Sequence, residues 1–317
     1  MSTIIDQNTI PLLFMKKIIT ICGPTGIGKT GFAIALAKAF SAEIVGADSM
    51  QIYKYMDIGT AKPDAAELAQ VPHHLVDFLD PSQDFDAGQY AHMAAQKIND
   101  ITRKDRIPII TGGTGLYIRA LLYGLFRSRP VCEKTLAHLT REAQEKGSAY
   151  LHHKLCACDP AAAQKIHPHD SFRIIRALEV FQTTGTPISQ MQKEHNFASP
   201  RYQSLTLGLF MDRNTLYERI NMRVDAMIRK GLLTEVVDLV QKGYSLDLKS
   251  MQSIGYRHMG GVLKKERDFD EAVFLLKRDT RRYAKRQFTW FKKEPGIIWL
   301  KPSQLTRAKT LVKEFLT

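Results

Sequence analysis

The segment GPTGIGKT at residues 23–30 constrains the fold of this 317-residue chain more than any other feature. It matches the phosphate-binding P-loop pattern G-x-x-x-x-G-K-[ST] at every fixed position. The β-branched run KKIITIC at 16–22 precedes it, and GFAIALAKAF at 31–40 follows with apolar residues at helical spacing. A strand, a glycine loop and a helix N-terminus together aim backbone N–H groups at a phosphate. We therefore predict that the chain binds a di- or triphosphate, with Lys29 as a point charge and the Thr30 hydroxyl suited to Mg²⁺.

The charge of the chain indicates a polyanionic partner. Its 45 Lys and Arg residues against 32 Asp and Glu residues give a net charge of +13, and the isoelectric point is about 9.5. This excess favours nucleic acid over a membrane surface. The four cysteines lack zinc-site spacing, so we expect reduced thiols in a cytoplasmic protein. We expect neither a signal peptide nor a membrane span.

Short apolar strands alternate with helical patterns in the first part of the chain. After the P-loop come a strand at 42–48, a helix at 88–103, a strand within 106–117 and a helix at 116–126. This alternation predicts an α/β fold, a P-loop NTPase-like doubly wound parallel sheet. Ligands of such sheets bind at the carboxyl ends of the strands. The loops at 23–30, 48–51 and 112–114 should therefore converge on one cleft.

The middle of the chain has a different character. Residues 129–204 carry helical patterns and turn signals but no convincing strand, whereas LTLGLFMD at 205–212 returns to strand character. We therefore predict a catalytic core of residues 16–128 and 205–317, with a helical insertion domain at 129–204.

A basic segment lies near the C-terminus, where residues 277–293 contain eight basic side chains against one acid, Asp279. Alone, this pattern equally fits a solvated surface helix with extended basic stems. Together with the net charge of the whole chain, it favours contact with a phosphate backbone.

Asp48 follows the second predicted strand, close to the P-loop in this topology. Three roles fit it: a ligand for Mg²⁺, a structural cap for the following turn, and a general base. The last role requires a nucleophile with a proton to lose, such as an amine or a hydroxyl. Ser49 and Gln51 beside it carry groups that are able to read the edge of a base.

Six segments of the chain resemble the tRNA dimethylallyltransferase family. GPTGIGKT is followed in order by DSMQIYKYMDIGTAKP (48–63), PHHLVDFLDP (72–81), GGTGLY (112–117), RIIRALEV (173–180) and SIGYR (253–257). The resemblance implies transfer of a dimethylallyl group from its diphosphate to N6 of the adenosine 3′ of the tRNA anticodon. It implies Mg²⁺ as cofactor, dimethylallyl diphosphate and the tRNA anticodon stem-loop as partners, and a cytoplasmic monomer without membrane contact.

The same resemblance assigns chemical roles to individual residues. Asp48 is expected to accept the N6 proton, Lys29 to neutralise the leaving diphosphate, Thr30 to place the metal, and Arg223 to contact the diphosphate. Without the family, Arg219 and Arg223 equally fit a solvated i,i+4 helix face. The expected diphosphate-binding set is Gly23, Pro24, Thr25, Gly26, Ile27, Gly28, Lys29, Thr30 and Arg219.

A larger set is expected, by resemblance, to face the tRNA. It comprises Asp48, Ser49, Met50, Gln51, Thr114, Arg173, Arg176, Gln252, Ser253, Ile254, Gly255, Tyr256, Arg257, Arg281, Arg282, Lys285 and Arg286. Two positions depart from the family pattern. Phe172 stands where the family usually has Gln, and the basic residue of a D-P-x-x-R setting is missing after Pro130.

Other functions fit parts of this pattern. A P-loop small-molecule kinase, or a prenyltransferase acting on free adenylate, would use the same loop. Neither would need the basic C-terminal helix or the helical insertion. A non-catalytic RNA-binding NTPase would need a Walker B acid, but the strand IPIITGG at 107–113 ends in glycine.

Overall fold

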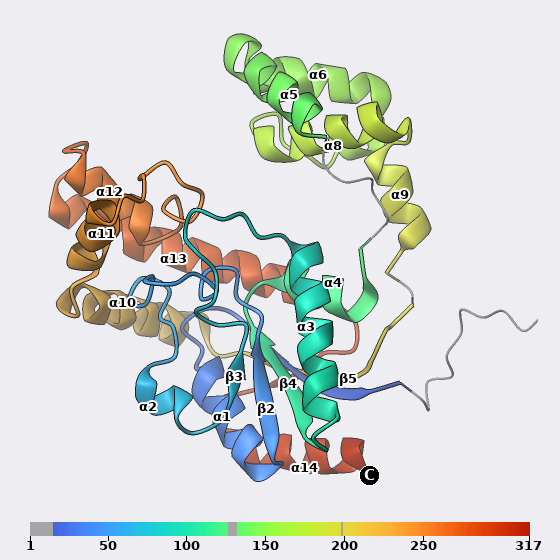
Figure 1. Ribbon diagram of the computed structural model, residues 1–317, viewed down its shortest axis with the longest axis vertical. Helices are drawn as coiled ribbons and strands as arrows, with labels where there is room; N and C mark the ends of the chain where they lie inside the picture. The colour runs from blue at the N-terminus through green and yellow to red at the C-terminus, as the bar shows by residue number, and fades with distance from the viewer. Residues whose placement is uncertain (1–14, 126–131, 198) are drawn as a thin grey trace, which may run out of the picture. The chain divides into compact units, whose positions relative to one another are not determined.

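The computed structural model describes residues 15–125, 132–197 and 199–317. The chain forms two compact units (Figure 1): one comprises the chain up to Leu122 together with Pro200–Thr317, and the other is Tyr123–Ser199. The border predicted at 128/129 lies outside the described residues. The border predicted at 204/205 falls inside a strand, because that strand begins two residues earlier than its apolar run indicates.

The first unit is built on a six-stranded sheet in which every pairing is parallel. Its strand order is β3-β2-β4-β1-β5-β6. The strands are β1 (Lys17–Cys22), β2 (Ala42–Gly46), β3 (His73–His74), β4 (Ile107–Gly112), β5 (Gln203–Leu209) and β6 (Ile298–Leu300). The predicted α/β class with a doubly wound parallel sheet is confirmed, and β3 and β6 are additions to it.

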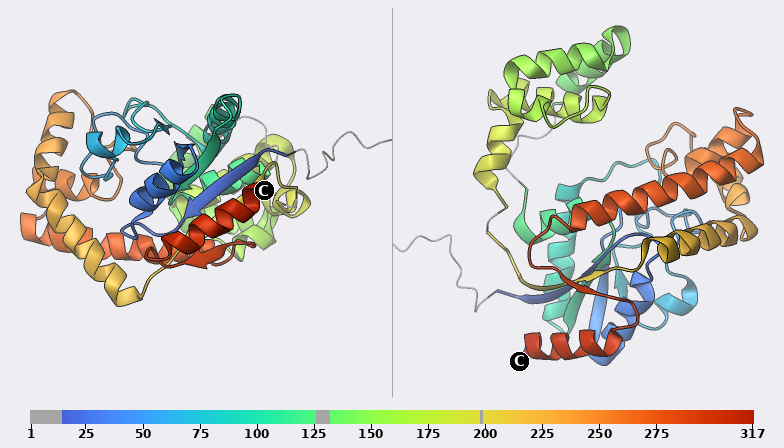
Figure 2. Two further views of the ribbon diagram at one scale, coloured as in Figure 1. Left: turned by 90° about the horizontal axis from the view of Figure 1, so that it is seen from below. Right: turned by 180° about the vertical axis from the view of Figure 1, so that it is seen from behind.

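Helices cover both faces of this sheet (Figure 2). On one face α1 (Lys29–Ala39) and α14 (Leu305–Leu316) bury a cluster that includes Ile19, Ile109 and Leu207 of the strands. The other face packs against α3 (Ala87–Thr102). Because successive residues of a strand point to opposite faces, strands covered on both sides are apolar almost throughout. This explains why the sequence of β1, β2 and β4 shows short apolar runs, from which these strands can be predicted.

The remaining helices of the first unit surround the carboxyl ends of the strands. They are α2 (Ala65–Leu68), α4 (Gly115–Tyr123), α10 (Arg213–Arg229), α11 (Leu232–Gln241), α12 (Tyr256–Leu263) and α13 (Phe269–Phe291). Tyr90 of α3 stacks on Tyr117 of α4 with ring centroids 4.4 Å apart. The long helix α13 packs against both α10 and α12, so it reaches from the P-loop to the outer helices (Figure 1).

The described residues of the second unit form helices joined by short turns and no strand. It consists of α5 (Glu133–Lys146), α6 (Ser148–Cys158), α7 (Pro160–Ala163), α8 (Ser171–Thr184) and α9 (Ile188–His195). Leu139, Leu155 and Ile174 belong to a core cluster of its own. Across residues 15–125, 132–197 and 199–317, no helix is both long and apolar enough to cross a lipid bilayer.

Candidate active site

The P-loop connects β1 to α1 at the carboxyl end of the sheet. Gly28 precedes α1 with a φ of 97°, a left-handed conformation that residues with a Cβ rarely adopt. The N–H groups of the first turn of α1 point toward the loop, and no described side chain caps them. Lys29 Nζ donates to the carbonyl oxygens of Gly23 and Pro24, each at 2.9 Å. The loop thus gathers backbone donors and one ammonium group, as a phosphate site requires.

Two further turns follow β2 and β4 at the same end of the sheet. Asp48 Oδ1 accepts hydrogen bonds from the backbone N–H of Met50 at 2.9 Å and of Gln51 at 3.4 Å. Thr114 Oγ1 accepts from the backbone N–H of Ser49 at 2.9 Å and so joins the two turns. The predicted convergence of the three loops is confirmed. Of the roles weighed for Asp48, the capping of its own turn is present in the structure.

Gln287 of α13 bridges the P-loop and the turn after β4. Its Oε1 accepts from the backbone N–H of Thr25 at 2.8 Å, and its Nε2 donates to the carbonyl oxygen of Gly113 at 2.9 Å. The residue is buried. Sequence reasoning missed it, because a buried amide inside a basic helix has the same appearance as a solvated one. It fixes the distance between two loops that the chain separates by almost ninety residues.

We expect that Gln287→Met lowers the free energy of unfolding by about 2–4 kcal/mol, since two backbone groups lose their partner away from water. Urea denaturation measures this change. Gln96→Met, on the exposed face of α3, is the matched control and is expected to shift stability by less than about 0.5 kcal/mol. Equal losses in the two variants would contradict the bridging role.

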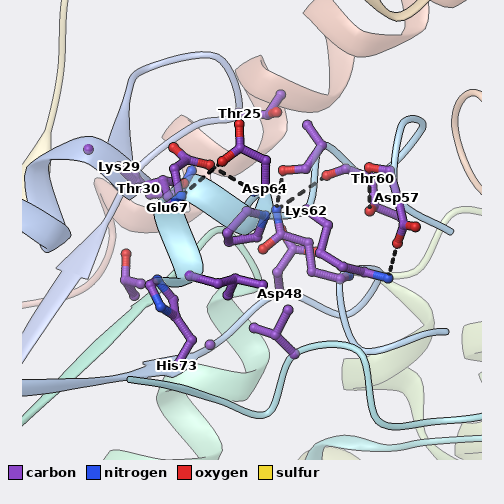
Figure 3. Close-up of a pocket in the computed structure, with 18 of the residues that line it drawn as sticks. Thr25, Lys29, Thr30, Asp48, Asp57, Thr60, Lys62, Asp64, Glu67 and His73 are labelled. Carbon is purple, nitrogen blue, oxygen red and sulfur yellow. Dashed lines mark hydrogen bonds and ion pairs between the residues drawn. The ribbon is translucent and has the colours of Figure 1, made fainter. Parts of the chain in front are cut away.

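The three loops open onto a cavity of about 670 Å³. Lys29, Thr30, Asp48 and Arg223 supply polar groups to its lining. Figure 3 shows Lys29 and Thr30 on one side of this cavity and Asp57 and Thr60 on the other. The apolar part of the lining includes Ile44, Ile58, Ala61, Pro63, Leu68, Val76, Ala226 and Met227. The cavity therefore combines a phosphate-binding wall with apolar surface.

Three cationic side chains surround the P-loop. Burial lowers the pKa of the Lys29 ammonium group to about 8, although the Asp48 carboxylate acts in the opposite direction. Burial also lowers the pKa of the Arg223 guanidinium, again opposed by Asp48. Arg219 is exposed, and a Cβ built on Gly28 would lie 3.5 Å from its Nη2. The structure thus brings Arg223 into the cavity and Arg219 beside the loop.

Residues 57–62 form the rim of the cavity opposite the P-loop. The Lys62 side chain is 5% exposed, and its Nζ donates to the Tyr53 carbonyl oxygen and to Asp77 Oδ1, both at 2.7 Å. From outside the rim, the Glu235 carboxylate of α11 accepts from the backbone N–H groups of residues 57, 58 and 59 at 2.7 to 3.0 Å. Neither Lys62 nor Glu235 was predicted from the sequence. A single carboxylate that binds the backbone N–H groups of a distant loop, as Glu235 does, has no recognisable motif in the sequence around it.

Two residues predicted to face RNA, Gln51 and Tyr256, form hydrogen bonds that hold this rim in place. Gln51 Nε2 donates to the carbonyl oxygens of Thr60 and Ala61, at 3.2 and 2.9 Å. Tyr256 is fully buried and donates its hydroxyl to Glu235 Oε1 at 2.6 Å. Gly255 is buried as well, whereas Gln252 and Arg257 at the ends of this segment are exposed. The expectation of a direct contact is therefore corrected for Tyr256, which positions the rim through Glu235.

The other residues that were predicted to face the tRNA range from exposed to half-buried. Arg281 Nη1 donates to Asn221 Oδ1 at 2.7 Å, and Arg282, Lys285 and Arg286 of α13 are exposed. In the helical unit, Arg173 is exposed with Asp170 at 3.4 Å, and Arg176 pairs with the buried Glu179. Phe172 is 75% exposed. Ser49, Met50, Thr114, Ser253 and Ile254 are half-buried.

Known proteins resemble this chain over nearly all of its length. A "tRNA dimethylallyltransferase" of Desulfosudis oleivorans is 52% identical over 95% of this chain and 96% of its own length. A protein of the same name from Acetivibrio thermocellus is 47% identical over 94% of this chain and 96% of its own length.

Solved structures agree with these relatives. A tRNA delta(2)-isopentenylpyrophosphate transferase from Staphylococcus epidermidis superposes with a TM-score of 0.70 at 38% identity, covering 94% of this chain and 99% of that one. A eukaryotic dimethylallyltransferase acting on tRNA gives a TM-score of 0.77 at 30% identity, and the match covers 94% of this chain and 77% of that one. The sequence model of the IPP transferase family matches residues 51–294, from Gln51 in the turn after β2 to Glu294, three residues beyond the end of α13. The chain that builds this cavity therefore belongs to the IPP transferase family.

Proposed function

We propose that this protein transfers a dimethylallyl group from dimethylallyl diphosphate to N6 of the adenosine 3′ of the anticodon in tRNA. The observation that carries the proposal is the convergence of a P-loop, a carboxylate and apolar surface on one cavity. The names of the relatives support tRNA as the acceptor and favour this reaction over a small-molecule kinase. A tRNA acceptor implies a cytoplasmic enzyme, and we expect it to act as a monomer.

The diphosphate of the donor would lie in the P-loop. Backbone N–H groups of the loop would bind its oxygen atoms together with the Lys29 ammonium and the Arg223 guanidinium, which line the cavity. Arg219, beside Gly28, would contact the diphosphate from the edge of the loop. As the allylic C–O bond breaks, negative charge grows on the leaving diphosphate. Groups that bind this charge more strongly in the transition state than in the bound donor accelerate the step. The apolar lining beside the loop suits the five-carbon chain.

The donor atoms around the P-loop fit a magnesium ion. The Thr30 hydroxyl and the Asp48 carboxylate line the same cavity, and no group of three or more potential metal-binding side chains occurs in residues 15–125, 132–197 and 199–317. Mg²⁺ commonly binds in this way, through few protein oxygens, substrate phosphates and water. When bound with the diphosphate, Mg²⁺ would supply further neutralisation of the leaving group.

Asp48 would act on the acceptor. An adenine N6 is a weak nucleophile, because its lone pair is delocalised into the ring, and it must lose a proton as the new C–N bond forms. Asp48 Oδ1 accepts from two backbone N–H groups, and Oδ2 has no hydrogen-bond donor within the described part of the chain. A carboxylate so fixed would direct its second oxygen at the incoming amine. The adenosine would have to leave its stack to reach the cavity.

The remaining surface would hold the tRNA. Exposed cations at Arg257, Arg282, Lys285 and Arg286 of the core would contact the phosphate backbone. In the helical unit, Arg173 would make a phosphate contact of its own, and Phe172 would offer a ring for stacking in place of the amide usual in the family.

The test of this proposal is a transfer assay. Purified protein is incubated with dimethylallyl diphosphate labelled in the prenyl group, Mg²⁺ and unmodified tRNA, and the label is counted in acid-insoluble RNA. Digestion to nucleosides then identifies the modified base. We expect N6-dimethylallyladenosine, with no label incorporated when tRNA is replaced by adenylate. Transfer to adenylate but not to tRNA would contradict the proposed acceptor, and ATP turnover without transfer would contradict the reaction.

A further inference from the structure

A second cavity lies between α12 and the first half of α13, and it shares no lining residue with the cavity at the P-loop. Its volume is about 280 Å³. Figure 1 shows α12 and α13 side by side at the outer end of the core unit. Four cationic side chains line it, and two acids oppose them. The cations are Arg257, Lys264, Arg267 and Arg278, and the acids are Glu266 and Asp279.

One carboxylate, that of Asp279, binds two of these four cations. Asp279 accepts from Arg257 Nη2 at 2.7 Å, from Arg278 Nε at 3.0 Å and from His258 Nε2 at 3.3 Å. Burial disfavours its charged form, but hydrogen bonds from Arg278 and Arg257 outweigh burial and lower its pKa to about 2. A single negative charge cannot neutralise two guanidinium groups. The positive charge of the cavity therefore exceeds its negative charge.

Arg267 has a buried donor that the protein leaves unused. Its Nε is inaccessible to solvent and has no hydrogen-bond partner among the described residues. The side chain approaches α12 at a glycine: a Cβ built on Gly261 would lie 2.9 Å from Arg267 Nε and 3.3 Å from its Cδ. Only a residue without a side chain leaves room for this placement. A buried guanidinium donor without a partner is unfavourable. Arg267 lines the cavity, so a shift of its side chain away from Gly261 would bring this donor to an acceptor bound there.

We infer that this cavity binds a backbone phosphate of the RNA acceptor, an inference that rests on the proposed function. Arginine forks match phosphate oxygens in geometry and in charge. The cavity opens on the same helix that carries Arg282, Lys285 and Arg286, so it continues a basic track. Gln287, at the P-loop, follows Asp279 by eight residues on α13, about 12 Å along a helix. A tRNA with its target base at the P-loop cavity reaches both places.

The test measures tRNA affinity over a series of salt concentrations. In Arg267→Gln, the slope of log Kd against log salt becomes smaller by about 0.7–0.9, and Kd near 0.1 M salt rises about tenfold, as for the loss of one phosphate contact. Gly261→Ala displaces the Arg267 side chain without changing any charge, and we expect a change in the same direction. Arg307→Gln removes an exposed charge on α14, which does not line this cavity, and is expected to leave the slope unchanged.

The outcomes separate this inference from the proposed reaction. If the wild type prenylates tRNA but the slopes of Arg267→Gln and Arg307→Gln agree, the phosphate site is overturned and the reaction stands. If Arg267→Gln and Gly261→Ala both lose affinity while no prenyl transfer occurs, the site stands and the reaction fails. Calorimetric titration with inorganic phosphate tests whether the cavity binds free phosphate and not a phosphate of RNA. Saturation by phosphate that requires Arg267, with unchanged tRNA slopes, would overturn the assignment to RNA.

Discussion

Asp48→Asn is expected to lower kcat for prenyl transfer to tRNA by roughly 10²–10⁴, the usual contribution of a positioned general base. Asparagine is the informative replacement, because its amide oxygen still accepts the hydrogen bonds from Met50 and Gln51 that Asp48 Oδ1 accepts now. The turn therefore survives, while the group that takes the N6 proton is lost. Single-turnover assays with tRNA and labelled donor measure the chemical step directly.

Two comparisons separate the roles that compete for Asp48. Asp57 lines the same cavity from the rim, so Asp57→Asn is a matched change of carboxylate to amide, and we expect only a few-fold effect on kcat. Asp48→Asn is then assayed over a range of Mg²⁺ concentrations. Recovery of activity at high Mg²⁺ would assign Asp48 to the metal instead of to the proton. Retention of full activity at ordinary Mg²⁺ would leave it only its turn-capping role.

The parts of the fold that could be predicted are those with a repeating or local signal. Strands β1, β2 and β4 are covered by helices on both faces and therefore consist of short apolar runs. The P-loop and the capped turn at Asp48 follow such strands directly, so topology alone placed them together. In contrast, β3 and β6 have two and three residues. Such segments are too short to show a period, and they pair only because neighbouring strands are already in place.

The parts of the site that could not be predicted come from helices that are remote in the sequence. Gln287 reaches the P-loop from α13, and Glu235 reaches the rim from α11. Each is a polar side chain that binds backbone groups of a distant loop, and its own surroundings in the sequence are those of an ordinary amphipathic helix. Tyr256 shows the reverse error. It belongs to a segment that carries the family resemblance, yet its ring is buried and its hydroxyl serves Glu235.

The affinity for the donor diphosphate is expected to depend on pH through Lys29. Burial lowers the pKa of this ammonium group to about 8 in the free protein, and a bound diphosphate would favour the charged form. Binding is then strongest below pH 8 and weakens about tenfold per pH unit above it, because a proton must be taken up. The neighbouring Cys22 thiol does not interfere, since burial raises its pKa to about 12.

Variants of Lys29 test this dependence. Lys29→Met removes the charge, and we expect the Kd for dimethylallyl diphosphate to rise about 10²-fold or more, with no dependence on pH between 7 and 9. Lys29→Arg keeps a charge that does not titrate in this range, so affinity is partly retained while the pH dependence disappears. Lys38→Met, on the exposed face of the same helix α1, is the control and should bind the donor as the wild type does. A pH dependence that persists in Lys29→Met would assign the titration to another group, because methionine has no proton to lose.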